Sequence, residues 1–194
     1  MPSIAILGSG NGSNAQALID AVEAGTLPVQ IRCILSDVQD ARILERARNH
    51  NIPAHFIDCT PSKSLLHQTA EAEVIQRLAD YEVDYVILAG FMRIIKQGLL
   101  DAYPRRIINI HPSLLPAFPG LDAGRQAFQA NVSETGCTIH YVDAGIDTGD
   151  IILQKKISID ATDTLESLMQ KIHTAEHIAY PEALNRLFNL EINR

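Results

Sequence analysis

The sequence contains no tryptophan, and aromatic residues of all kinds make up only 5% of its 194 residues. No apolar run approaches the roughly 20 residues of a membrane-spanning helix, so we expect no membrane partner. The opening residues, Met1-Pro2-Ser3-Ile4, lack the basic and small-residue features of a signal peptide. These absences together predict a cytoplasmic protein.

Cysteine and positive charge are also scarce. The three cysteines, Cys33, Cys59 and Cys137, form no CxxC pair, which favours reduced thiols over a disulfide framework. The formal net charge is −7 with no run of Lys or Arg, which argues against a nucleic-acid partner because such binding neutralises phosphates. Apolar residues make up 46% of the chain, enough for the core of a single domain of this length.

A glycine-rich loop, Gly8-Ser9-Gly10-Asn11-Gly12, follows a short apolar run at residues 4–7. The run predicts a buried parallel strand. After the loop, Ser13 and Gln16 have the spacing of a capping box, and they predict the start of a helix. The free N–H groups and dipole of a helix N-terminus attract an anion, so the loop is a candidate phosphate site. The apolar stripe of this helix is Ala15, Leu18, Ile19 and Val22.

Two other interpretations of the loop stay open. A dinucleotide fingerprint needs glycine where Ser13 stands, although Asp37, after a predicted strand at residues 29–35, resembles the ribose-binding acid of NAD proteins. The other interpretation is a tight turn that binds nothing.

Strands and helices alternate through the first half of the chain. Further strands are predicted at residues 54–57 and 85–89, one helix at residues 41–49, and another from Thr60-Pro61-Ser62 onward. The alternation predicts an α/β fold: a Rossmann-like, mostly parallel twisted sheet with helices on both faces. Ligands of such sheets bind beyond the carboxyl ends of the strands, so we expect loops 8–12 and 90–93 and His111 to face one cleft. The predicted stripe of the helix after residue 60 includes Leu65, Ala72, Ile75 and Leu78.

The chain changes character after Pro112. Prolines predict an irregular connection to Gly120, followed by a short helix at residues 125–130. Strands at residues 137–142 and 151–154 predict an antiparallel hairpin. Asp163 and Glu166 predict a capping box for a long last helix, which Pro181 would kink or restart. We expect one domain with an N-terminal lobe, residues 1–105, and a C-terminal lobe, residues 106–194.

Asn109 and His111 interrupt an apolar strand that begins at Ile107. Their i, i+2 spacing places both side chains on the same face, and Pro112 ends the strand directly after them. An amide beside an imidazole can stabilise an oxyanion and manage a proton. The alternative is a polar pair that is satisfied locally at a strand end.

Other polar residues invite functional interpretations as well. Glu176 lies on or beside the apolar stripe of the last helix and needs a protein donor or a ligand hydroxyl, unless water solvates it at the edge. The sequence His173-x-x-Glu176-His177 matches an inverted zinc-protease motif but lacks a third ligand. Asp143, Asp147 and Asp150 lack the EF-hand spacing. We expect no metal.

Five stretches of the sequence resemble the phosphoribosylglycinamide formyltransferases, the folate-dependent enzymes of purine synthesis. The resemblance runs from the first strand to the last helix, and it implies the formyltransferase fold. It also implies 10-formyltetrahydrofolate as cosubstrate and 5'-phosphoribosylglycinamide as substrate. The stretches are Ser9-Gly10-Asn11-Gly12-Ser13-Asn14, Leu88-Ala89-Gly90-Phe91-Met92-Arg93-Ile94, Asn109-Ile110-His111-Pro112-Ser113-Leu114-Leu115-Pro116, Ile146-Asp147-Thr148-Gly149 and Ala175-Glu176-His177.

The resemblance further implies roles for individual residues. Asp147 would favour the protonated imidazole of His111 by opposite charge, and Asn109 would act with them. Glu176 would bind the ribose hydroxyls of the substrate, and the loop from Asp143 would close the folate pocket. The implied catalytic set is Asn109, His111 and Asp147; the phosphate site is Gly12, Ser13 and Asn14; the folate pocket is lined by Met92, Arg93, Ile94 and Ile95, partly through backbone groups, with Asn109 and Asp143.

The sequence departs from the family in places, and rival functions exist. Gly124 stands where family members often carry histidine, and His67 and Lys63 are two candidates for a basic folate contact. A formyltetrahydrofolate deformylase usually has an extra N-terminal domain, and a methionyl-tRNA formyltransferase has an RNA-binding domain and basic surfaces. A non-catalytic phosphate or nucleotide sensor would explain the glycine loop alone. Either a monomer or a homodimer is compatible with the sequence.

Overall fold

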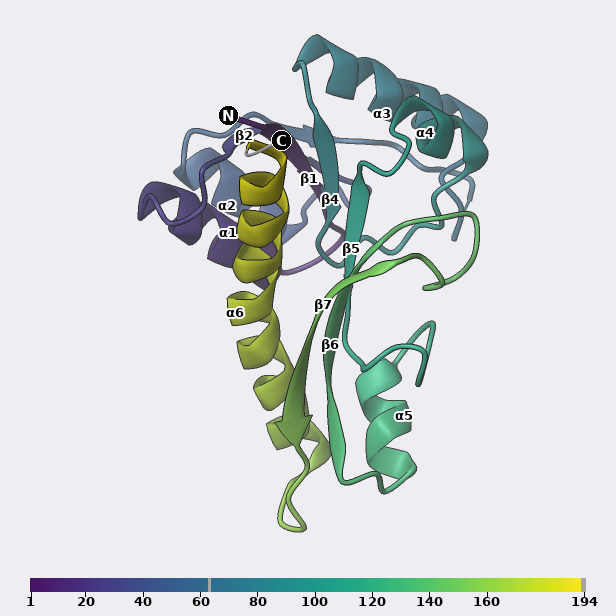
Figure 1. Cartoon of the computed structure of the whole chain (residues 1–194). Helices are drawn as coiled ribbons and strands as arrows, with labels where there is room; N and C mark the ends of the chain where they lie inside the picture. Colours follow the sequence, from purple (N-terminus) through teal and green to yellow (C-terminus); the bar gives the residue numbers. More distant parts are fainter. Residues whose placement is uncertain (63, 193–194) are drawn as a thin grey trace. The chain divides into compact units, whose positions relative to one another are not determined.

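The computed structural model describes residues 1–62 and 64–192, and the chain divides into two compact units, Met1–Ile108 and Asn109–Arg194 (Figure 1). The first unit holds β1 (Ser3–Leu7), α1 (Ser13–Glu23), β2 (Gln30–Ser36), α2 (Arg42–Asn49), β3 (Ala54–Phe56), α3 (Gln68–Asp80), β4 (Tyr85–Leu88) and α4 (Gln97–Ala102). β5 (Ile107–His111) leads into the second unit, which continues with α5 (Ala123–Gln129), β6 (Glu134–Tyr141), β7 (Ile151–Ser158) and α6 (Leu165–Ile192).

The strands of the described residues form a seven-stranded sheet in the order β3-β2-β1-β4-β5-β6-β7. β1 pairs in parallel with β2 and β4, and β2 with β3, whereas β6 and β7 are antiparallel. The predicted α/β fold, a mostly parallel sheet with a C-terminal hairpin and a long last helix, is confirmed.

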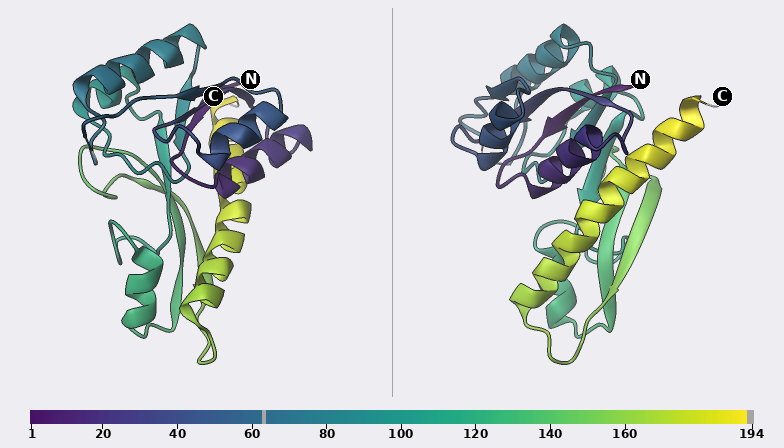
Figure 2. Two further views of the ribbon diagram at one scale, coloured as in Figure 1. Left: turned by 180° about the vertical axis from the view of Figure 1, so that it is seen from behind. Right: turned by 90° about the vertical axis from the view of Figure 1, so that its left-hand side faces the viewer.

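The first unit is built on continuous apolar strands. All five residues of β1 and all four of β4 are buried, as expected for strands covered on both faces. α1 and α2 pack together on one side of these strands, and α3 and α4 lie on the other (Figures 1 and 2). Right-handed crossovers account for the change of face, since the chain returns from β3 to β4 across the sheet. The carboxyl ends of β1, β2 and β4 therefore meet at one edge.

The helix after the glycine loop starts differently from the prediction. Its N-cap is Gly12 in the left-handed conformation, φ +75°, and no side chain caps it. The predicted capping box of Ser13 and Gln16 is wrong, because the Gln16 side chain instead bonds Asp20 and Arg46. A Cβ on Gly12 would lie 2.7 Å from the Ile43 side chain, so both backbone conformation and close packing require glycine.

The third helix also begins later than predicted. It starts at Gln68, where the Nδ1 atom of His67 accepts a hydrogen bond from the N–H of Ala70. Residues 60–62, the predicted start, lie outside the helix, and the Thr60–Pro61 peptide bond is cis. Leu65 lies before the helix, and Ala72 and Ile75 are not on its buried face, so the predicted stripe is wrong apart from Leu78. The buried residues of α3 are Ala70, Val74 and Leu78.

The second unit consists of a hairpin covered by a long helix. β6 and β7 each run for eight residues, longer than predicted, and α6 packs against both strands (Figure 1). Gly136 permits the pairing, since a Cβ there would lie 1.9 Å from the carbonyl oxygen of Lys155. No helix in the part of the chain that the structure describes combines the length and apolar character needed to cross a membrane.

The long helix departs from the prediction at its start and at its proline. The reciprocal capping bonds join Thr164 and Ser167, one residue beyond the predicted pair of Asp163 and Glu166. Asp163 instead accepts hydrogen bonds from Ser167 and Lys171. Pro181 lies inside the helix, which continues to Ile192, so the expected restart is wrong. Fully buried neighbours on both sides of the proline hold the helix through packing: Tyr180, Ala183 and Leu184.

Gly124 lies at the contact between α5 and α6. A Cβ at this position would stand 2.5 Å from the Sδ atom of Met169 and 3.1 Å from the Cδ1 atom of Ile172. A side chain at residue 124 would therefore require the Met169 side chain to move.

We expect Gly124→Ala to lower the free energy of unfolding by about 1–3 kcal/mol, because the added methyl group overpacks the contact with Met169. The double variant Gly124→Ala/Met169→Ala should be less destabilised than the sum of the two single variants, since removal of the thioether makes room. Urea unfolding of the four proteins tests this. Strict additivity would show that Met169 is not the obstacle.

Candidate active site

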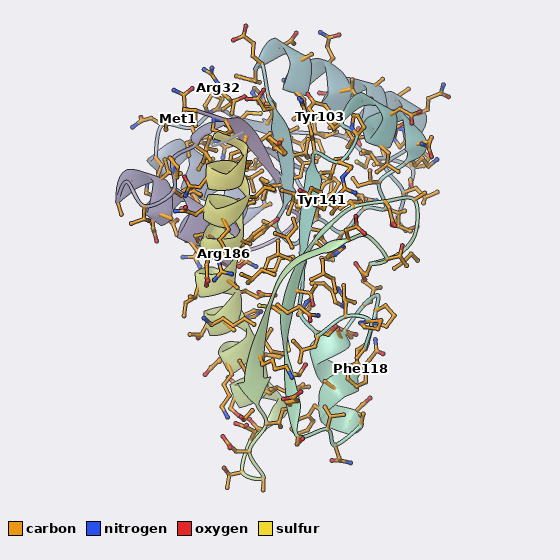
Figure 3. The ribbon with its side chains drawn as sticks, viewed as in Figure 1. Met1, Arg32, Tyr103, Phe118, Tyr141 and Arg186 are labelled. Atoms are coloured by element: carbon orange, nitrogen blue, oxygen red, sulfur yellow. The ribbon has the colours of Figure 1, made fainter. Side chains whose placement is uncertain are left out.

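The end of β5 carries Asn109 and His111, and His111 is 5% exposed. Its Nδ1 atom lies 3.3 Å from Oδ2 of Asp147, and its Nε2 atom donates to the carbonyl oxygen of Phe118 at 2.8 Å (Figure 3 labels Phe118). Both ring nitrogens thus face oxygen acceptors. A ring with a proton on each nitrogen satisfies both contacts, whereas a neutral ring satisfies only one.

Two strained backbone positions bring these acceptors to His111. Phe118 and Asp147 both have φ of +54°, a conformation that is rare for a bulky residue such as phenylalanine. The Oδ2 atom of Asp147 also accepts a hydrogen bond of 2.8 Å from the N–H of Gly120. The loop after β5 and the loop between β6 and β7 are therefore joined through one carboxylate. Strain of this kind is common where surrounding contacts hold a functional geometry.

His140 on β6 is the site residue that the sequence did not reveal. Its Nδ1 atom donates to the carbonyl oxygen of Tyr141 at 2.8 Å, so Nε2 is free to accept from the Asn109 amide nitrogen at 3.2 Å. Burial lowers the pKa of His140, although the hydrogen bond to Tyr141 and the charge of Asp147 oppose this shift. A neutral His140 fixes which end of the Asn109 amide carries the N–H groups. One N–H of that amide remains for a ligand oxygen.

A signal for His140 was present in the sequence. It shares a face of the predicted strand with Thr138, and both side chains are almost fully buried. A buried histidine one strand away from Asn109 and His111 is a candidate partner. Strand order, which the sequence pattern does not give, was needed to make that connection.

The loop between β6 and β7 is organised by Asp143. Its Oδ1 atom accepts hydrogen bonds from the N–H of Gly145 at 3.0 Å and from the hydroxyl of Thr148 at 2.7 Å. Gly149 lies so close to β6 that a Cβ would stand 1.8 Å from the carbonyl oxygen of Tyr141. Asp143 thus shapes the loop, while Asp147 extends from it to His111. Within residues 1–62 and 64–192, no three His, Cys, Asp or Glu side chains form a group that could hold a metal.

Glu176 lies on the buried face of α6 and is 4% exposed, which excludes a solvated position at the edge of the stripe. Burial, followed by the charge of Glu176, raises the pKa of Cys137 to about 12. The same two causes raise the pKa of Tyr180. His173 is exposed, whereas Glu176 is buried.

In the first unit, the glycine loop packs against the start of α2. The carbonyl oxygen of Gly10 accepts from the N–H of Ile43, and Arg46 donates to the backbone oxygen and the side-chain oxygen of Asn11, each at 2.8 Å. Arg46 also donates to the side chain of Gln16 at 3.0 Å. A guanidinium group therefore lies beside the N-terminus of α1. Its charge adds to the attraction of that helix end for an anion.

Asp37, the candidate ribose-binding acid, is already occupied. It is 8% exposed, its Oδ2 atom lies 2.5 Å from Nε of Arg93, and its Oδ1 atom accepts from the hydroxyl of Ser9. This pairing argues against the NAD interpretation.

The segment after β4 presents apolar side chains to solvent. Met92 is 58% and Ile94 49% exposed, whereas Ile95 is buried. The structure brings this segment to the glycine loop, since the N–H of Ser9 donates to the carbonyl of Gly90 at 3.0 Å. His67, one of the two basic folate candidates, caps α3, and Lys63 lies outside the described residues.

Comparison with known proteins identifies the class of this fold and site. Residues 3–184 match the family model described as formyl transferase. The chain is 44% identical to phosphoribosylglycinamide formyltransferase of Bacillus subtilis (strain 168), over 98% of this chain and 96% of that protein. The crystal structure of phosphoribosylglycinamide formyltransferase from Bacillus halodurans is similar with a TM-score of 0.90 and 49% identity, covering 95% of this chain and 94% of the other.

The chain therefore belongs to the formyl transferase family. Within that family it groups with the phosphoribosylglycinamide formyltransferases, as the sequence resemblance predicted, and it has their fold. It is also 42% identical to the trifunctional purine biosynthetic protein adenosine-3 of Drosophila pseudoobscura pseudoobscura, over 98% of this chain but 14% of that protein. A formyltetrahydrofolate deformylase from Pseudomonas syringae shares the fold with a TM-score of 0.88 but only 27% identity, and the match covers 60% of that chain.

The neutral state of His140 leads to a prediction about stability and pH. Because burial lowers its pKa, the unfolded chain binds a proton more readily than the folded chain below about pH 6.5. The free energy of unfolding therefore falls as pH drops from that value towards the folded-state pKa. His140→Gln should reduce this slope by up to about 1.4 kcal/mol per pH unit.

Denaturant unfolding between about pH 5 and pH 7.5 measures this slope. His173→Gln is the matched control, because His173 is exposed on α6 and should leave the slope unchanged. Equal slopes in the His140→Gln variant and the unaltered protein would show that His140 is not held neutral.

Proposed function

We propose that the chain transfers the formyl group of 10-formyltetrahydrofolate to the amine of 5'-phosphoribosylglycinamide, giving formylglycinamide ribonucleotide and tetrahydrofolate. The observation that carries the proposal is the cluster of Asn109, His111 and Asp147, in which an amide and a paired imidazole lie at one strand end. The close relatives that bear the name of this reaction support it.

The proposed reaction needs no nucleophile from the protein, because the substrate amine attacks the formyl carbon. The carbonyl double bond opens to a tetrahedral oxyanion, which Asn109 and the imidazolium of His111 stabilise by hydrogen bonds. The carbon–nitrogen bond to the folate then breaks. The amine proton passes to the departing folate nitrogen, by way of a water that Asp147 positions, so charge and atoms balance.

His111 has to exchange one partner for this role. Its Nε2 proton is directed at the carbonyl oxygen of Phe118, and its Nδ1 atom faces Asp147. We propose that the formyl oxygen replaces Phe118 while Asp147 keeps its place. The Asn109 amide needs no such change, since His140 occupies only one of its N–H groups.

The other proposed roles follow the chemistry of each segment. Gly12, Ser13 and Asn14 bind the substrate phosphate through the N-terminus of α1, and Arg46 supports their loop. Glu176 accepts hydrogen bonds from the ribose hydroxyls. The folate residues are Met92, Arg93, Ile94 and Ile95, together with Asn109 and with Asp143, which shapes its loop.

We also propose that the two predicted lobes have different roles: residues 1–105 bind the phosphate, and residues 106–194 contain the catalytic residues. A deformylase would use the same cluster to activate water in place of an amine. The lower identity to the deformylase structure favours the transferase. A sensor of phosphate or nucleotides does not account for the paired imidazole of His111.

We expect His111→Ala and Asp147→Asn each to lower kcat by about 100- to 1,000-fold, the usual effect of losing one oxyanion-stabilising contact. Both proteins should remain folded, since the apolar packing of α6 on β6 and β7 holds the unit together and the His111–Asp147 contact joins only its loops. Steady-state formation of tetrahydrofolate measures the effect. His173→Ala serves as a control from an exposed position, and near-normal turnover by either site variant would refute the role given to that residue.

The same assay separates the transferase from the hydrolase. Consumption of 10-formyltetrahydrofolate should require 5'-phosphoribosylglycinamide, and the formyl group should appear on that substrate. Consumption at the same rate without the amine, with release of formate, would establish a deformylase. The absence of consumption in both cases would favour a binding protein.

A further inference from the structure

The segment after β4 is held by a buried clamp, which we define as Ser9, Asp37 and Arg93. These residues follow β1, β2 and β4, so three strand ends are joined at one edge of the sheet. The Asp37 side chain is 3% exposed and that of Arg93 is 13% exposed. Asp37 receives Nε of Arg93 on one oxygen and the hydroxyl of Ser9 on the other.

The clamp acts on the backbone of the exposed apolar segment. The hydroxyl of Ser9 accepts a hydrogen bond of 2.8 Å from the N–H of Met92, and Nη1 of Arg93 donates to the carbonyl of Ser62 at 2.6 Å. The N–H of Ile94 donates to the carbonyl of Ser64, and the carbonyl of Ile94 accepts from the N–H of Leu66. One edge of this extended segment is therefore fixed.

The opposite edge of the segment has no backbone partner among residues 1–62 and 64–192. The N–H groups of Met92 and Ile94 are bonded on the fixed edge, and the backbone of Arg93, which lies between them in sequence, faces the other edge. No described residue forms a hydrogen bond with the N–H or C=O of Arg93. An open donor and acceptor on a rigid extended segment offer a ligand the contacts of a sheet edge. Exposed Leu65, Met92 and Ile94 add apolar surface beside it.

The charge of Arg93 is compensated before any ligand arrives. Its guanidinium lies 2.5 Å from a buried carboxylate, and a second donor is used by the Ser62 carbonyl. Such a cation is a poor partner for an anionic group of a ligand, since separation from Asp37 would leave a buried charge uncompensated. The surface presented is an uncharged backbone edge with apolar neighbours, which suits a flat, neutral heteroaromatic ring.

We propose that Asp37 and Ser9 are positioning residues for the ring of the folate cosubstrate, acting through Arg93 and Met92. This inference rests on the proposed function, because it concerns the folate site of that reaction. Neither residue contacts the ligand. They set the place of the open backbone edge, so their loss weakens folate binding and leaves the chemical step intact.

Two variants test the clamp: one removes a neutral hydroxyl, and the other removes the buried carboxylate. Ser9→Ala removes the hydroxyl that links Asp37 to the Met92 N–H, and it creates no buried charge. We expect it to raise the Kd for tetrahydrofolate and the KM for 10-formyltetrahydrofolate by about fivefold, the effect of one neutral hydrogen bond. Asp37→Ala should raise both by tenfold or more, as for loss of a charged hydrogen bond. Asp37→Asn keeps an oxygen acceptor and should lie between Asp37→Ala and the unaltered protein.

The split between constants distinguishes positioning from general damage. At saturating cosubstrate, kcat of Ser9→Ala should stay within about twofold of the unaltered protein, because the hydrogen bond it loses serves ground-state and transition-state binding alike. Asp80→Asn is the matched control: it removes an exposed carboxylate of the same unit, which accepts a hydrogen bond from Gln76 on its own helix. It should change no constant.

The outcomes separate the clamp from the proposed function. Tetrahydrofolate binding by titration calorimetry needs no turnover, so it decides the clamp even if formyl transfer is absent. A Kd within twofold of the unaltered protein in both Ser9→Ala and Asp37→Ala would overturn the clamp. A fall in kcat with unchanged KM and Kd would also overturn it. Failure of the unaltered protein to bind tetrahydrofolate would overturn clamp and function together.

If Asp37→Ala does not fold, Ser9→Ala decides alone. The single variants Ser9→Ala and Arg93→Met and the double variant Ser9→Ala/Arg93→Met form a double-mutant cycle for the Kd of tetrahydrofolate. Because both residues act through Asp37 on one segment, their effects on Kd should be less than additive. Full additivity would show that they act separately, which contradicts the clamp.

Discussion

The second unit is organised around the contact between the His111 imidazole and the Asp147 carboxylate. A largely buried carboxylate, such as that of Asp147 at 13% exposure, needs hydrogen-bond donors or a counter-charge. The Oδ2 atom of Asp147 accepts from the N–H of Gly120 and lies beside the ring of His111, and its Oδ1 atom lies 3.6 Å from Nε2 of His140. The two loops that Asp147 joins are thereby held together. Left-handed backbone at Asp147 and at Phe118 is the strain that this arrangement requires.

The same site also depends on His140, which orients the Asn109 amide. Two histidines lie near one aspartate in different surroundings. His111 faces the Phe118 carbonyl and Asp147, whereas His140 faces the Tyr141 carbonyl and, at Nε2, the Asn109 amide at 3.2 Å with Oδ1 of Asp147 farther away at 3.6 Å. The lowered pKa of His140 follows first from burial. A neutral histidine keeps the Asn109 amide oriented, and a charged one would reverse the hydrogen bond. The division resembles the general way in which neighbouring titratable groups acquire different roles.

Sequence patterns predicted the order of the main elements because continuous apolar runs such as β1 and β4 have few alternatives in an α/β chain. They failed where local signals competed. The start of α3 was misplaced since Thr60-Pro61-Ser62 resembles a helix start, yet His67 caps the helix. The six-residue α4 is too short to show a period. Asn109, His111 and Asp147 were visible as motifs, but His140, Arg46 and the Asp37 clamp depend on contacts between distant segments, which no spacing encodes.

The carbonyl of Phe118 gives the site an internal competitor. A ligand oxygen reaches the Nε2 proton of His111 only if it accepts a hydrogen bond better than an amide carbonyl does. A ground-state formamide oxygen is about equal to that competitor and gains little, while an oxyanion exceeds it by the margin of a charged acceptor. The Nε2 proton of His111 therefore stabilises the bound substrate little, and it stabilises the reacting group more as negative charge develops on the oxygen. Such selective stabilisation is what accelerates a reaction, in contrast to tight binding of the substrate itself.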